Sequence, residues 1–226
     1  MISRMRLERG VPIFFNQPRG MSSGQMQLVA KAVCANCNNG WMSRLEDSFQ
    51  PVFSRLNSWE RFTLTDSESD IAALWAVKTA AMFQQNDPET RTFSLEDLRG
   101  LRETGKPPPK TSVWMFAMDS AEDEFRLTQQ GAHLGSPEDK IDAAFPASLG
   151  QTFLGAQRVA FVVVHGPHPL IDEEQLPVPG WRTARLLWPR LKPAKWPTLP
   201  AQHAEVNVLK LLPAAAFVPG ALFLDE

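Results

Sequence analysis

Apolar positions recur at helical spacing just after the first quarter of the chain, at 45, 49, 52, 53 and 56. This spacing places them on one face, so we expect a helix that packs inward along that face. Gly40 breaks the preceding backbone, which predicts a helix start near Trp41 or Met42. Pro51 lies inside the pattern. It should kink or restart the helix, because proline lacks an amide donor and its ring clashes with the preceding turn.

Two further helices carry recognisable start signals. Thr65 and Glu68 have the spacing of a capping box, and the apolar positions that follow continue to Phe83. Asn86-Asp87-Pro88 should end this second helix. The third helix is expected to start at Ser94, with Phe93 and Leu98 placed as a hydrophobic staple around the cap.

The period changes from helical to extended after a stiff connector, Lys106-Pro107-Pro108-Pro109-Lys110. Strands are predicted at 113–118, 125–128, 159–164 and 184–188, and the valine-rich run at 159–164 should be central. The remaining expectations are a turn at 119–123, loop at 131–150, extended chain at 189–200 and a short helix at 206–212. Upstream of the first helix we expect short strands at 11–15 and 27–33, with a turn at 20–24.

Together these elements predict an α+β protein with a three-helix region followed by a small, mostly antiparallel sheet. The Pro-rich connector divides the chain, so the predicted regions are residues 1–105, with the helices, and residues 111–226, rich in strands. The sequence contains no internal repeat and no low-complexity tract.

Composition narrows the function classes. The chain has 226 residues and a net charge of −2, so it lacks the overall basic field of many nucleic-acid-binding proteins, although a local patch is compatible with that charge. No apolar run approaches the roughly 20 residues that cross a bilayer, and the N-terminus lacks the apolar core of a signal peptide. We therefore expect a cytoplasmic protein without membrane association. Two cysteines exclude a disulfide framework.

Those two cysteines, Cys34 and Cys37, are the only residues whose type and spacing together indicate a chemistry. A Cys-x-x-Cys pair supplies two thiolates to one Zn²⁺, but a structural zinc site needs four ligands. His165 and His168 have ligand-like spacing and would complete an intrachain site if the sheet folds back onto the cysteines. A homodimer would complete the site with two pairs of cysteines. Alternatively, the pair is an inherited, metal-free turn.

A redox function must also be considered. Thioredoxin-type pairs lie on the first turn of a helix, where the helix N-terminus lowers the pKa of the thiol. Here Asn38, Asn39 and Gly40 follow the second cysteine, which argues against immediate continuation as a helix.

The segment Cys34-Ala35-Asn36-Cys37-Asn38-Asn39-Gly40-Trp41-Met42-Ser43-Arg44-Leu45-Glu46 resembles the second zinc knuckle of bacterial HNH-endonuclease-like proteins. The resemblance continues weakly in residues 75–80 and in the Trp-Pro segment 188–197. It implies a ββα-metal element, truncated here, at the head of the helical region. In the family, a histidine activates water, an asparagine orients that histidine, and a divalent metal stabilises the phosphate.

By this resemblance Asn38 takes the family's asparagine position, and Cys34 and Cys37 form half of the zinc site. No histidine precedes His133, and the first knuckle is missing. One interpretation is therefore a degenerate HNH-like protein, not an enzyme, that binds DNA or a protein partner. A second is a truncated form, or late-started reading frame, of an active nuclease. A third is an unrelated phage or mobile-element interaction module.

The other candidate residues indicate a function less specifically. Trp181, Trp188 and Trp196 suit either a protein-contact surface or ordinary packing. The acidic clusters at 122–124 and 172–174 suit a hard cation or, more simply, solvated loops. No nucleophile-elbow or phosphate-binding glycine motif occurs in the sequence.

Overall fold

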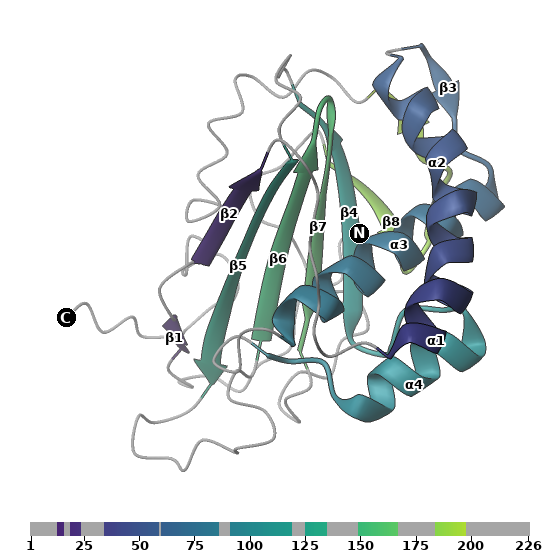
Figure 1. Cartoon of the computed structure of the whole chain (residues 1–226). Helices are drawn as coiled ribbons and strands as arrows, with labels where there is room; N and C mark the ends of the chain where they lie inside the picture. The colour runs from purple at the N-terminus through teal and green to yellow at the C-terminus, as the bar shows by residue number, and fades with distance from the viewer. Residues whose placement is uncertain are drawn as a thin grey trace.

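The computed structural model has one layer of helices packed on one face of an antiparallel sheet (Figure 1). It confirms the predicted α+β class. The structure describes residues 13–15, 19–23, 34–58, 60–85, 91–118, 125–134, 149–166 and 184–197. The expected strand at 27–33, the stop signal at 86–88, the turn at 119–123 and the helix at 206–212 lie outside these residues.

Among the described residues, the helical layer consists of five segments: α1 (Ala35–Cys37), η1 (Asn38–Met42), α2 (Ser43–Asn57), α3 (Asp66–Gln84) and α4 (Leu95–Thr104). The first three follow one another as a helical rod that is interrupted at Gly40, where non-helical φ and ψ angles of −103° and −108° mark a kink between two helices. The predicted break at Gly40 is confirmed, and α2 begins at Ser43, just after the predicted start near Trp41 or Met42. The short turn of α1, which begins at Ala35, was not predicted. The helix does not restart at Pro51, since α2 continues through this proline to Asn57.

Both predicted caps are confirmed. The N–H of Glu68 donates to Thr65 Oγ1 at 3.2 Å, and the N–H of Thr65 donates to Glu68 Oε2 at 2.7 Å. Ser94 and Asp97 form the same reciprocal pair at the start of α4. These bonds satisfy amide groups that would otherwise be orphaned at each helix start. They fix where α3 and α4 enter the fold.

In the described part of the chain, seven strands form the main sheet: β1 (Ile13–Phe15), β2 (Arg19–Ser23), β4 (Thr111–Ala117), β5 (Phe125–Leu134), β6 (Leu149–Ala156), β7 (Val159–His165) and β8 (Arg185–Trp188). Their order is β1-β5-β6-β7-β4-β8, with β2 also on β5. All pairings are antiparallel. A second, two-stranded sheet joins β3 (Phe62–Thr63) to β9 (Lys195–Trp196).

Two predictions for the sheet are corrected. Residues 20–23 belong to β2 instead of a turn. The loop expected at 131–150 is shorter, because β5 runs to Leu134 and β6 begins at Leu149. β6 carries glycine at 150 and 155 and buried polar side chains at Gln151 and Thr152, so it lacks the composition typical of a strand.

The helices and the sheet share one hydrophobic core. Helix α3 contacts β4, β6, β7 and β8, and α2 packs on α3. Phe161 of β7 lies edge-on to both Phe49 and Trp75, with ring centroids 5.9 and 5.8 Å away. The division of the chain at the connector stays a prediction, but residues on both sides of it contribute to a single buried cluster.

Candidate metal-ligating site

The candidate site begins at Cys34, which precedes α1 in an extended conformation. The backbone N–H of Cys37 donates to Cys34 Sγ at 3.2 Å, and the N–H of Asn38 donates to the Cys34 carbonyl oxygen at 3.0 Å. Cys34 thus caps its own helix with sulfur, where serine, threonine or aspartate would use oxygen. A three-residue helical turn thus begins inside the Cys-x-x-Cys motif, and the kink at Gly40 interrupts the helix soon after the second cysteine, where the sequence predicts an interruption.

The two thiols differ in acidity. Both are free; Cys34 is exposed and Cys37 is half-buried. The side chain and then the backbone amide of Cys37 donate to Cys34 Sγ, which lowers the pKa of Cys34. Donating that hydrogen bond raises the pKa of Cys37, and desolvation adds to the rise. The pair therefore holds one proton between two sulfurs once Cys34 has ionised.

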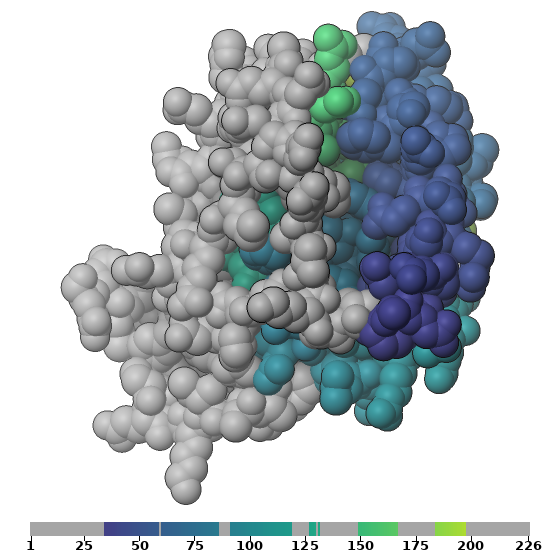
Figure 2. Space-filling model, viewed as in Figure 1, coloured from purple at the N-terminus to yellow at the C-terminus, as the bar shows by residue number. Residues whose placement is uncertain are grey.

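Arg102 brings a positive charge to the pair from α4. Its Nη1 lies 3.9 Å from Cys37 Sγ, and its charge acts to lower the pKa of both thiols. Figure 2 shows the start of the helical rod at the surface, beside α4. A guanidinium next to the two thiols favours the thiolate form, which is the form that binds metals and reacts with electrophiles.

The residues that follow Cys37 attach the cysteine turn, residues 34–37, to the core. Met42 and Leu45 are buried, and Trp41 packs partly buried against the same cluster. Glu46 continues this attachment with polar contacts to α3. Its Oε2 accepts the indole N–H of Trp75 at 2.7 Å, and its Oε1 pairs with the ammonium of Lys78.

Two of the three stretches that carry the family resemblance touch directly, through Glu46 and the pair Trp75 and Lys78, and the third touches a later part of α2. Phe49 of α2 stacks on Trp75 with ring centroids 4.3 Å apart. The indole N–H of Trp196 donates to the carbonyl oxygen of Leu56 at 2.9 Å in the buried core. Residues 34–46, 75–80 and 188–197 are thus parts of one packed unit around α2 and α3.

The other predicted site residues are placed as follows. Asn38 is exposed in the turn after Cys37. His165 is only 2% exposed, and its ring stacks on Phe93 at 4.1 Å. Burial lowers the pKa of His165 to about 4. Among the described residues, no group of three or more histidine, cysteine, aspartate or glutamate side chains gathers, so His165 does not join the cysteines.

Several candidates cannot be placed. His168, His203, Trp181 and both acidic clusters lie outside the described residues. Arg102 was missed by the sequence analysis because 65 residues separate it from Cys37. No pattern in the sequence indicates that α4 packs beside the cysteine turn.

The comparisons with known proteins do not assign the chain to a family. No protein-family model, curated protein or solved structure matches the chain. Within the described ranges, the helices are too short or too polar to cross a bilayer.

Proposed function

We propose that this chain is an HNH-like binding protein in which Cys34 and Cys37 supply two thiolate ligands to a structural zinc ion. The observation that carries the proposal is the geometry of the thiol pair: Cys34 Sγ accepts the amide N–H of Cys37 at 3.2 Å, and Arg102 Nη1 lies 3.9 Å from Cys37 Sγ. Zinc binding requires deprotonated sulfur, and a lowered first pKa reduces the cost of that deprotonation.

The residues present fit half of a zinc site. Two sulfurs from one helical turn suit two corners of a tetrahedron. The described residues offer no third ligand, so the remaining two would come from the rest of the chain or from a second copy of it. Bound zinc would hold the cysteine turn rigid, which is a structural role and needs no open coordination position.

The burial of His165 favours a binding role over nuclease catalysis. A general base must reach the water that it activates and must have a pKa near the working pH. His165 is enclosed against Phe93, and its pKa is lowered. Asn38, at the family's asparagine position, is exposed, whereas His165, the one histidine whose side chain the structure describes, is buried. The partner proposed is DNA or a protein.

Zinc content per chain tests the metal proposal. The protein is purified without chelators and analysed by inductively coupled plasma mass spectrometry, together with Cys34→Ser, Cys37→Ser and the control Asn36→Ala. We expect about one zinc per chain for an intrachain site, or about half for a site shared in a dimer. Both serine variants should lose the metal, and Asn36→Ala should retain it. Absence of zinc from the wild-type protein, even after incubation with zinc salt, would refute the proposal.

Plasmid cleavage tests the absence of catalysis. The wild-type protein should leave supercoiled plasmid intact in Mg²⁺ or Mn²⁺. Metal-dependent cleavage that Asn38→Ala abolishes would instead support an active nuclease. DNA binding that weakens steeply with salt would identify DNA as the partner, since each neutralised phosphate adds to the salt dependence.

A further inference from the structure

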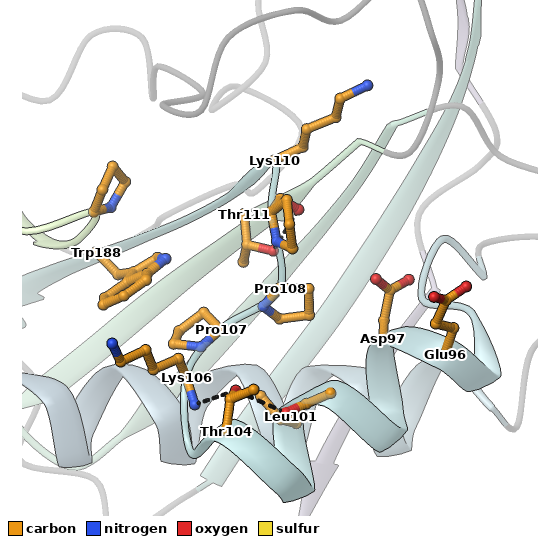
Figure 3. Close-up of a pocket in the computed structure, with 13 residues that line it drawn as sticks. Glu96, Asp97, Leu101, Thr104, Lys106, Pro107, Pro108, Lys110, Thr111 and Trp188 are labelled. Atoms are coloured by element: carbon orange, nitrogen blue, oxygen red, sulfur yellow. Dashed lines mark hydrogen bonds between the residues drawn. The ribbon is translucent and has the colours of Figure 1, made fainter.

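Arg102 places a positive charge beside the thiol pair. Its Nη1 lies 3.9 Å from Cys37 Sγ, although 65 residues separate the two in the chain. The last turn of α4, which carries Arg102, is anchored to the fold. Leu101 is 1% exposed in the core, and Thr104 Oγ1 accepts the backbone N–H of Lys106 at 3.2 Å (Figure 3). The turn that carries the guanidinium is therefore fixed next to the sulfurs.

This charge distinguishes between the ways in which a zinc site can be completed. Structural zinc sites use four cysteines, or cysteines together with histidines. Two thiolates and two neutral imidazoles around Zn²⁺ have no net charge, so a neighbouring guanidinium gains little from such a site. Four thiolates around Zn²⁺ leave two negative charges, which a guanidinium on each side would balance. The position of Arg102 thus favours a site with four thiolates.

A site with four thiolates needs a second copy of this chain. The sequence holds two cysteines, Cys34 and Cys37, so one chain supplies no more than two thiolates. The parts of the chain that the structure describes add no third ligand to them. Each copy would contribute one Cys-x-x-Cys pair, and a two-fold axis would relate the copies, as in most homodimers.

The surface around the pair allows a second copy to approach. Figure 2 shows the start of the helical rod at the surface of the molecule, beside α4. Residues 34–42 carry no charged side chain. The exposed residues next to the thiols are small or uncharged: Ala35, Asn36, Asn38 and Asn39. Without metal, the two Arg102 guanidinium groups would bring like charges together, which opposes association of the copies.

We propose that the cysteine pair binds a second copy of this chain through a shared zinc site of four thiolates, whose charge the two Arg102 side chains balance. The proposal rests on the zinc binding proposed above and identifies the source of the two missing ligands. Arg102 contacts a ligand and not the metal, so it is a positioning residue. The copies associate when zinc is present and separate when it is removed.

The mass of the full-length protein in solution tests the proposal. Protein kept reduced with a phosphine is analysed by size-exclusion chromatography with light scattering, in zinc or in EDTA. Wild type should be a dimer with about half a zinc per chain, and a monomer after chelation. Cys34→Ser and Cys37→Ser should stay monomeric in zinc, whereas the control Asn36→Ala should dimerise. Non-reducing electrophoresis should show no disulfide between the copies.

Variants of Arg102 test the role of its charge. Arg102→Gln should weaken the zinc-dependent dimer about tenfold or more in sedimentation equilibrium, because the charge beside the sulfurs is removed. Arg102→Lys keeps the charge and should restore most of the affinity, which a purely structural role would not predict. Arg61→Gln is the matched control, since this exposed arginine follows the far end of α2. It should dimerise like wild type.

The outcomes separate this proposal from the zinc proposal. About one zinc per chain in a monomer would overturn the shared site and leave the zinc proposal standing. Wild-type protein without zinc would refute both. A dimer that persists in EDTA or in Cys34→Ser would show that the copies associate through another surface, which also overturns the shared site. An Arg102→Gln dimer as stable as wild type would overturn the role of the charge.

Discussion

At the scale of single residues, the two cysteines are predicted to react at different rates. The hydrogen bonds from Cys37 lower the pKa of Cys34 and raise that of Cys37, so Cys34 carries more thiolate at neutral pH. Brief treatment of the metal-free protein with iodoacetamide at pH 7, followed by peptide mass spectrometry, should show Cys34 alkylated several-fold faster. Equal labelling, or faster labelling of Cys37, would contradict the proton sharing inferred for the pair.

The buried His165 should make the folded protein less stable in acid. Burial lowers its pKa from 6.5 to about 4; nearby Asp97 opposes this shift, and Lys110 adds to it. Between these pH values the unfolded chain binds a proton that the folded chain does not, so stability falls as pH drops from about 6.5 towards 4. The full loss should be about 3 kcal/mol, and about 2 kcal/mol of it should occur above pH 5, since one pKa unit corresponds to about 1.36 kcal/mol.

Urea unfolding at pH 7.5 and pH 5 measures this loss. His165→Phe should keep the stacking on Phe93 but remove the titrating group, so the difference between the two pH values should shrink in that variant. An unchanged difference would assign the pH dependence to other groups.

At the scale of elements, Glu46 is predicted to link α2 to α3 through Trp75 and Lys78. The Lys78 side chain is only 9% exposed, whereas Glu46 is 47% exposed, so removing the carboxylate leaves a nearly buried ammonium without its partner. Glu46→Gln should lower the free energy of unfolding by about 1–2 kcal/mol, below the range for fully buried pairs. Adding Lys78→Met should recover much of this loss in a double-mutant cycle. Additive losses would show that the two residues are not coupled.

A substitution in helix α4 is predicted to stabilise the folded protein. Gly100→Ala should raise the free energy of unfolding by about 0.5–1 kcal/mol, because alanine has the higher helix propensity and its Cβ meets no neighbour. Chemical denaturation measures the change, and Gly105→Ala is the contrasting variant. Gly105 ends α4 with a φ of +63°, where alanine is strained, so that substitution should destabilise the protein.

The same elements show what the sequence could and could not predict. Thr65 and Ser94 mark their helix starts through local hydrogen bonds, which depend only on residues three positions away. β6 was missed because its first glycine is explained by a distant contact: a Cβ at Gly150 would lie 2.8 Å from Thr92. The helix start at Ala35 was missed because cysteine is not an expected capping residue. The Cys-x-x-Cys motif could be recognised from the sequence. The contact of Arg102 with it could not, because it depends on tertiary packing.

At the scale of the whole molecule, Phe161 is predicted to couple the sheet to the helices. This β7 residue is 1% exposed and contacts Phe49 of α2 and Trp75 of α3. Phe161→Ala removes a side chain from the shared core and should cost about 3–5 kcal/mol. Because one buried cluster spans the connector, far-ultraviolet circular dichroism and tryptophan fluorescence should lose signal in a single coincident transition, in both wild type and variant.

The alternative is that the predicted regions 1–105 and 111–226 unfold as separate units. In that case, Phe161→Ala would shift the transition of the strand-rich region and leave that of the helices nearly unchanged. Leu191→Ala is a matched control, since Leu191 lies on the same side of the connector but is 64% exposed. Its removal should change the midpoint little. Coincident transitions that move together for Phe161→Ala alone would therefore establish that the helices carrying Cys34 and Cys37 are held in place by the sheet.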